Sequence, residues 1–261
     1  SASYKRLADA QMAIELATRS KASSVELIDG RLFHQAAVSG KIVEWAPKEC
    51  FKGVVVLAIF DEFSDRARNK ATKKLMRKLE SSEAVDVKNI NLEEQDIFSL
   101  HSVLALAEMP SEPHMITPRA FSGILMAPEQ MSGFIESMKP LEAKYGVNLP
   151  IFIDFSSDYI ALYPTFDSKK VSERQKILQL LSELAQIVDK HNGSFAGFGG
   201  DGRLKANFIY KNLPDDEKRL YAKVKSIFDP SGVFNPGVKS EVQPKELAAE
   251  LNMWCKLHNQ A

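Results

Sequence analysis

The chain has 261 residues, of which 44% are hydrophobic and 26% are charged, and its 34 Lys and Arg residues are balanced by 34 Asp and Glu residues. This length is enough for one buried core or two small ones. Zero net charge argues against nucleic-acid binding, which needs an excess of Lys and Arg to displace phosphate counterions.

The cysteines and the apolar runs bear on the cellular compartment of the protein. Cys50 and Cys255 lie far apart, and neither belongs to a CxxC pair. This pattern argues against a disulfide framework and against a structural zinc site, and it favours a reducing, cytoplasmic compartment. The longest apolar run, residues 54–60, is far shorter than the ~20 residues needed to span a bilayer.

The first clear elements alternate between strands and helices. Residues 54–60 are a β-branched run that predicts a buried strand. A helix follows over residues 64–79, with a serine at its N-cap. Residues 123–126 predict a short strand, and residues 128–145 predict a helix that begins with proline and ends before a glycine.

A β-hairpin is predicted next. Residues 149–155 and 159–166 read as its two strands, and a polar Ser-Ser-Asp turn joins them. Asp154 and Asp158 flank this turn. Aspartate side chains commonly bond the backbone of such turns, so we expect them to shape the turn rather than to form a catalytic carboxylate pair.

Helices dominate the C-terminal half. Residues 177–188 place apolar side chains on one helix face, and Gly193 is predicted to end that helix at its C′ position. Residues 204–213 favour a short strand, and another helix begins at Pro214. Its inward-facing residues are expected to be Leu220, Val224 and Ile227. Residues 246–257 form the last predicted helix.

These elements predict an α+β fold. We expect a largely antiparallel, ferredoxin-like sheet that is covered by helices and followed by a helical C-terminal segment. The sequence contains no internal repeat, low-complexity stretch or obvious linker. We therefore expect a single domain over residues 1–261.

A glycine-rich loop at residues 197–202 reads Gly-Phe-Gly-Gly-Asp-Gly and matches the pattern GxGxxG. The dinucleotide-binding form of this pattern needs a strand before it, a long helix after it and an acidic residue ~20 positions later. The segment that follows the loop, residues 204–213, is too short for the long helix that the pattern requires. Ala222 and Lys223 occupy the position of the required acidic residue. The loop therefore indicates a tight turn, whose backbone amides and neighbouring Arg203 suit an anion or a cofactor edge.

Three ordered segments are more specific than any one of them alone. They are Gly193-Ser194, residues 197–203, and residues 228–237, which read Phe-Asp-Pro-Ser-Gly-Val-Phe-Asn-Pro-Gly and follow Lys225. In this order and spacing they resemble the end of FAD-linked oxidases of the vanillyl-alcohol-oxidase type, in particular the D-lactate and glycolate dehydrogenase branch. The resemblance covers roughly residues 20–240.

This resemblance implies a C-terminal, substrate-side domain of an FAD-dependent oxidoreductase. In such enzymes a separate N-terminal domain holds most of the FAD, and no segment of this chain matches the pyrophosphate-binding segment of that domain. By resemblance, Asn235 is a polar contact to the flavin ring, and Lys239 is a neighbouring charge that tunes it. The full set of implied cofactor contacts is Gly200, Arg203, Asn235, Gly237 and Lys239.

The sequence departs from the family where a metal ion and a 2-hydroxy acid would bind. Phe198 and Gly199 replace the Glu and His of the family's glycine loop, and residues 150–159 contain no histidine. A divalent ion needs several converging N or O ligands, so we expect no metal site. His101 lies near the position of a family arginine that binds substrate, which makes it the substrate-binding candidate.

Two functions are compatible with these residues. The first is completion of the flavin pocket of an oxidoreductase that acts on an alcohol or a 2-hydroxy acid such as D-lactate or glycolate. Its partner is an FAD-binding domain in cis or in trans, and the isolated chain is expected to be inactive. The second is a degenerate, non-catalytic domain that binds a protein partner or a small ligand. The missing Glu and His favour the second, and the retained turn at residues 235–237 favours the first.

The predicted helix at residues 64–79 is strongly basic. Its cationic residues are Arg66, Arg68, Lys70, Lys73, Lys74, Arg77 and Lys78. A solvated helix face is the common explanation for such a pattern. The alternative is docking to an acidic protein or peripheral attachment to the inner face of the membrane.

Overall fold

The computed structural model of the chain describes residues 1–38, 51–90, 104, 107, 108, 110, 112–197 and 200–258. Contacts between residues group the chain into two compact units. Unit 1 comprises Ser1–Ser111 and Leu149–Tyr163, and unit 2 comprises Glu112–Asn148 and Pro164–Ala261. A single domain over residues 1–261 stays a prediction.

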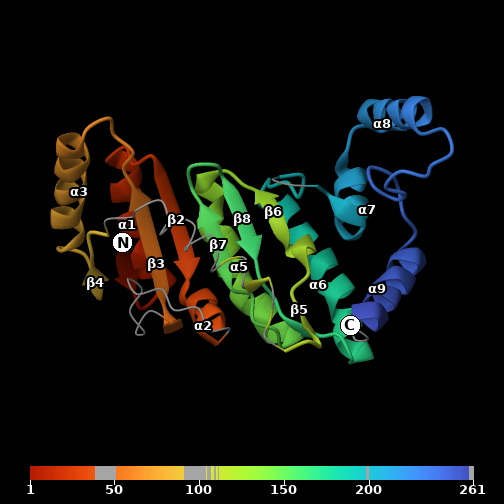
Figure 1. The fold of residues 1–261 in the computed structure, drawn as a ribbon, viewed down its shortest axis with the longest axis horizontal. Coiled ribbons are helices and arrows are strands. Elements are labelled where there is room, and N and C mark those ends of the chain that lie inside the picture. The colour runs from red at the N-terminus through yellow and green to blue at the C-terminus, as the bar shows by residue number, and fades with distance from the viewer. Residues whose placement is uncertain are drawn as a thin grey trace. The chain divides into compact units, whose positions relative to one another are not determined.

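Unit 1 is built on an antiparallel sheet with the strand order β4-β1-β3-β2-β7-β8 (Figure 1). The strands are β1 (Ala2–Tyr4), β2 (Ser24–Asp29), β3 (Val54–Ile59), β4 (Asp86–Val87), β7 (Ile151–Asp154) and β8 (Tyr159–Leu162). The order of the first four strands, with a helix after β1 and another after β3, is the ferredoxin-like arrangement. The α+β fold with a largely antiparallel, ferredoxin-like sheet is therefore confirmed.

The helices of unit 1 are α1 (Leu7–Arg19), α2 (Gly30–Val38) and α3 (Asp65–Leu79). Helix α1 packs on β1, β2 and β3 through Ala10, Ala13 and Ala17, whose small side chains permit a close approach. Helix α2 adds its buried apolar residues to a core cluster with Ile28 of β2 and Val55 of β3. Helix α3 begins as predicted, because the Ser64 hydroxyl accepts a hydrogen bond from the backbone N–H of Ala67.

The predicted hairpin is confirmed as β7 and β8. One carboxylate oxygen of Asp154 accepts the backbone N–H of Ser156 at 2.8 Å, and the other accepts the hydroxyl of Ser157 at 2.6 Å. Asp158 has a left-handed backbone with φ of +57°. Asp154 therefore shapes the turn, as expected from its position.

Unit 2 is mostly helical. Its main elements are β5 (Met115–Ile116), a 3-10 turn η2 (Arg119–Phe121), β6 (Ser122–Leu125), α5 (Pro128–Tyr145), β9 (Phe166–Asp167), α6 (Val171–Lys190), α7 (Gly202–Asn212), α8 (Asp215–Phe228) and α9 (Pro244–His258). Strands β5 and β9 pair with each other, and α5 packs on α6. Helix α5 begins at Pro128 and ends at Gly146, which has φ of +61°, as the sequence predicts.

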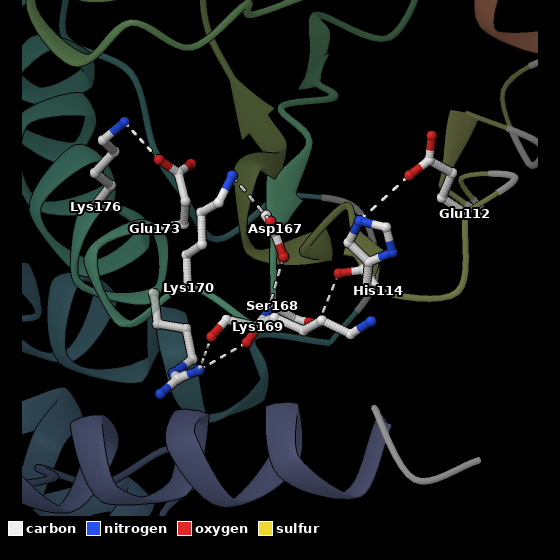
Figure 2. A network of polar contacts seen from close by, with 9 residues as sticks. Glu112, His114, Asp167, Ser168, Lys169, Lys170, Glu173 and Lys176 are labelled. Atoms are coloured by element: carbon white, nitrogen blue, oxygen red, sulfur yellow. Dashed lines mark hydrogen bonds and ion pairs between the residues drawn. The ribbon is translucent and has the colours of Figure 1, made fainter.

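Polar contacts hold the start of α6 to its neighbours (Figure 2). The carbonyl oxygen of His114 accepts the backbone N–H and the hydroxyl of Ser168, at 2.8 and 2.6 Å. Arg174 donates to the carbonyl oxygen of Ser168 and to the amide oxygen of Asn252, each at 2.7 Å. These bonds tie α6 to the chain around the β5–β9 pair and to α9.

Two local predictions for unit 2 are wrong. Residues 204–212 lie in helix α7 rather than in a strand, because Ala206 and Ile209 pack inward at helical spacing and outweigh the β-forming residues around them. The left-handed residue after α6 is Asn192, with φ of +53°, and not Gly193. Glycine is needed at 193 for space, since a Cβ there would lie 2.9 Å from side-chain atoms of Met126 and Val188.

The inward face predicted for α8 is also wrong. None of its residues is buried, and Leu220, Val224 and Ile227 are 60%, 46% and 62% exposed. The three apolar residues do lie in a helix, as predicted, but no other part of the described chain covers them. None of the helices in the described ranges combines the length and the apolar character required to cross a bilayer.

Candidate functional site

The glycine loop and the turn that follows α8 lie against each other in unit 2. The Lys239 ammonium pairs with the carboxylate of Asp201. A Cβ built on Gly237 would lie 2.8 Å from Nε of Arg203, so the guanidinium rests directly on the glycine backbone. We call residues 200–203 and 235–239 the loop–turn site.

The sequence-predicted contacts Gly200, Arg203, Asn235, Gly237 and Lys239 all belong to this site. The structure therefore brings together two segments that are more than 30 positions apart in the sequence. Their contact with a flavin stays a prediction.

Asp229 builds the loop that leads to the turn. Its carboxylate accepts the backbone N–H groups of Val233 and Phe234, each at 2.9 Å. Lys225 lies 2.5 Å from the same carboxylate and also donates to the carbonyl oxygen of Phe234. The hydrogen bond from Lys225 and those from the two amides keep the pKa of Asp229 below its usual value. The Lys and Asp of this motif therefore have a structural role, which is to fold the loop and present Asn235.

The turn itself depends on left-handed backbone. Asn235, Gly237 and Lys239 have φ of +44°, +77° and +57°. Glycine adopts this conformation without strain, whereas Asn tolerates it and Lys does so at a cost. At Gly237 the absence of a side chain has a second effect, because it leaves room for Arg203.

The other end of the site is anchored by Lys205, a residue that the sequence reasoning missed. Its ammonium is buried and donates to the carbonyl oxygens of Ser122 and Phe195, at 3.0 and 3.4 Å. Burial lowers the pKa of Lys205. The available signal was its place beside Ala206 and Ile209 on the inner face of α7.

Gly197 fixes the loop to β6. Its backbone N–H donates to the carbonyl oxygen of Gly123 at 2.9 Å, and a Cβ at position 197 would lie only 2.4 Å from that oxygen. The close backbone approach predicted for the glycine-rich loop is therefore present. A helix, α6, and an isolated bridge at Ser194 precede the loop instead of the strand that a dinucleotide fingerprint requires.

Two polar groups of the site, the Asn235 amide and the Lys239 ammonium, are accessible to a ligand. The Asn235 side chain is exposed and forms no hydrogen bond with the described residues. Nε of Arg203 is buried and lacks an acceptor among those residues, while its terminal nitrogen pairs with Glu250. The site thus offers a ligand the exposed amide of Asn235 and the partly exposed ammonium of Lys239, which is paired with Asp201. Polar groups of this kind suit the edge of an electron-accepting ring.

The remaining predicted residues lie elsewhere. His101, Phe198 and Gly199 are outside the described residues. Within the described ranges no group of three or more His, Cys, Asp and Glu residues is arranged to hold a metal ion. His114 pairs with Glu112 at 3.3 Å, and His191 packs edge-on against Phe134.

Comparison with protein families and curated proteins gives consistent matches. The model of a family described as FAD linked oxidases, C-terminal domain, matches residues 1–238. The chain is similar to the glycolate oxidase subunit GlcD of Escherichia coli strain K12, with 25% identity over 107 residues, which is 41% of this chain and 21% of that protein. The corresponding subunit of Bacillus subtilis strain 168 is 23% identical over 108 residues, or 41% of this chain and 23% of that protein.

Two solved structures have a similar fold. A 4-ethylphenol oxidase from Gulosibacter chungangensis, in complex with isoeugenol, aligns with a TM-score of 0.61 at 15% identity, over 92% of this chain and 52% of that chain. A p-cresol methylhydroxylase with bound substrate aligns with a TM-score of 0.59 at 12% identity, over 91% of this chain and 51% of that chain. The chain therefore spans about half the length of these proteins, and this likeness concerns the fold alone.

Proposed function

Because the chain belongs to the family of FAD linked oxidases, C-terminal domain, we propose that it is the substrate-side domain of an FAD-dependent oxidoreductase and that its loop–turn site completes the flavin pocket. The substrate class that we propose is an alcohol or a 2-hydroxy acid such as D-lactate or glycolate. Similarity to two glycolate oxidase subunits supports the hydroxy acid.

One observation carries this proposal. The Asp201–Lys239 ion pair and the contact between Arg203 and Gly237 hold the loop and the turn together as one surface. On that surface the exposed side chain of Asn235 has no hydrogen-bond partner among the described residues. FAD, when bound, supplies a two-electron acceptor for the oxidation of an alcohol. Asn235 would bind and orient the ring edge, Lys239 would favour negative charge on it, and Arg203 would support the turn from below through its contact with Gly237.

A partner that carries most of the FAD also fits the surface next to the turn. Phe228, Val233 and Phe234 are 79%, 69% and 68% exposed, and they continue the uncovered apolar face of α8. Contiguous exposed apolar side chains of this kind mark sites of protein contact. A domain that brings a flavin to Asn235 would cover Phe234, its sequence neighbour. We propose an FAD-binding domain, in cis or in trans, as that partner.

The FAD content of the chain and of its complexes tests the proposal. We expect the purified chain to be colourless and inactive with D-lactate and glycolate. Tagged chain recovered from cells that contain its partner should carry FAD, which is measured by fluorescence after acid release. The Asn235→Ala/Lys239→Met variant should recover much less FAD, and the exposed control Lys139→Met should recover as much as the wild type. A purified chain with one tightly held FAD, or complexes without any flavin, would contradict the proposal.

The second candidate is a non-catalytic domain that binds a protein partner. The apolar face of α8 favours it as much as it favours an FAD-binding partner. Complexes that form through α8 but contain no flavin would support this candidate, and Asn235 variants would then leave complex formation unchanged.

A further inference from the structure

Helix α3 concentrates positive charge in a chain whose total charge is zero. Its 15 residues include seven Lys and Arg residues and a single acidic residue, Asp65, which gives a net charge of seven minus one, or +6. The proposed flavin function does not use this helix, since α3 belongs to unit 1 and the loop–turn site belongs to unit 2.

The charges form a stripe on the outer face of α3. At 100° per residue, five cationic positions fall within a face about 100° wide. These residues, which we call the basic stripe, are Arg66, Lys70, Lys73, Lys74 and Arg77, and all five are exposed. Leu75 and Leu79, the buried residues of the helix, lie on the opposite face. The stripe spans about 16 Å along the helix axis.

The basic stripe is not neutralised within the described chain. Arg68, which lies off the stripe, pairs with Asp65 and donates to the carbonyl oxygen of Glu62. None of the five stripe residues forms a hydrogen bond or an ion pair with the residues that the structure describes. Five like charges held on one face repel one another, so an anionic surface would be stabilising there.

An exposed aromatic residue directly precedes the N-cap of the helix that carries the stripe. Phe63 is 111% exposed and directly precedes Ser64, the N-cap of α3. It is therefore in contact with no apolar group that would shield it from water. Exposed aromatic side chains next to a basic helix are typical of segments that lie at a lipid interface, where the ring enters the headgroup region.

We propose that the basic stripe and Phe63 dock on an anionic lipid surface and attach the protein peripherally to it. Each Lys or Arg near such a surface strengthens binding about fivefold, so five cations give a reversible attachment. Three of the five are lysines, whose flexible point charges suit a diffuse layer of phosphates and carboxylates. The fully exposed ring of Phe63 can enter the headgroup region of a bilayer, a contact that charge pairing alone with an acidic surface does not provide.

Vesicle sedimentation of the full chain tests this inference. The wild type should bind vesicles in which about a third of the phosphatidylcholine is replaced by phosphatidylserine, it should not bind phosphatidylcholine alone, and added salt should release it. The variant Lys70→Glu/Lys73→Glu/Arg77→Glu should bind at least about a hundredfold more weakly. A matched control with the same change in net charge is Lys139→Glu/Lys223→Glu/Lys256→Glu, at exposed positions outside α3, and it should retain most of the binding.

Phe63→Ser separates lipid from other anions. This variant should bind the anionic vesicles about fivefold more weakly and should bind soluble polyglutamate as the wild type does. Circular dichroism and urea midpoints confirm that each variant is folded. Equal vesicle binding by the two triple variants would overturn the inference. So would polyglutamate binding as tight as vesicle binding, which would indicate an acidic protein as the partner.

Discussion

The carboxylate of Asp201, which is buried at the start of α7, pairs with the ammonium of Lys239, which lies at the end of the turn and is 45% exposed. This pair joins two segments that have no backbone hydrogen bond to each other among those described. It is also asymmetric, because Lys239 can reach water when its partner is lost and Asp201 cannot.

This asymmetry gives a prediction for Lys239→Met. The change leaves a buried carboxylate without its partner, and we expect a loss of about 1–2 kcal/mol of unfolding free energy. A double-mutant cycle with Asp201→Asn should give a coupling energy of about 1 kcal/mol. Urea unfolding measures both. A coupling energy near zero would show that the pair does not hold the turn to the loop.

Gly237→Ala should be more harmful than an alanine at another left-handed glycine. Gly146 has φ of +61° and open space around its Cβ position, so Gly146→Ala measures the backbone strain alone, about 1 kcal/mol. At Gly237, with φ of +77°, the new methyl group also meets Arg203 at 2.8 Å. We expect a cost of about 2–3 kcal/mol there.

Arg203→Ala provides the control for that contact. In its background, Gly237→Ala should cost no more than Gly146→Ala, because the methyl group then has space. Thermal unfolding of Gly146→Ala, Gly237→Ala, Arg203→Ala and the double variant Arg203→Ala/Gly237→Ala measures these stability costs. If Gly237→Ala costs the same with and without Arg203, the guanidinium does not rest on the turn.

Much of the fold was predictable because local chemistry and tertiary packing agree. Ser64, Pro128 and Gly146 mark helix ends through capping hydrogen bonds and backbone preference, which depend on few neighbours. Strand β3 is a β-branched run that is buried. In these places the sequence pattern has one physical solution.

The sequence predictions fail at positions where tertiary contacts, rather than the local sequence, determine the structure. In α7 the β-forming residues Phe208 and Tyr210 lie in a helix because Ala206 and Ile209 pack inward at helical spacing. The face of α8 has a helical period, but a period cannot show whether anything covers it. The sequence does not predict the role of Lys205, because the carbonyl oxygens that bind its buried ammonium come from segments outside its own helix. The order of the three motifs predicts that the loop and the turn belong to one site. No local pattern predicts the ion pair between Asp201 and Lys239.

The exposed face of α8 makes a prediction about stability. Ile227→Ser should change the unfolding free energy by less than about 0.5 kcal/mol, because the side chain is 62% exposed. Leu184→Ala in α6 is the comparison, since Leu184 is fully buried and should lose about 2–5 kcal/mol. Urea unfolding of both variants is the measurement. A loss of more than about 1 kcal/mol at Ile227 would mean that this face is covered in the free chain.

Glu26 makes the stability of unit 1 depend on pH. It lies on β2 opposite Asp154 of β7, is 7% exposed, and its Oε2 has no hydrogen-bond partner among the described residues. Burial, together with the charge of Asp154, raises the pKa of Glu26 from 4.5 to about 7. The folded protein therefore holds this proton at pH values where the unfolded chain has lost it. The contribution of Glu26 to the free energy of unfolding is full below pH 4.5 and falls as the pH rises through about 7.

Glu26→Gln should remove this dependence. The amide stays neutral at every pH, so the variant should gain on the wild type between pH 4.5 and 8, by about 3 kcal/mol for this difference in pKa. The control is Glu136→Gln on the exposed side of α5, whose stability should follow the wild type across the same range. Urea midpoints taken at intervals of pH measure the three curves. Parallel curves for the wild type and Glu26→Gln would mean that Glu26 ionises in the folded protein as it does in the unfolded chain.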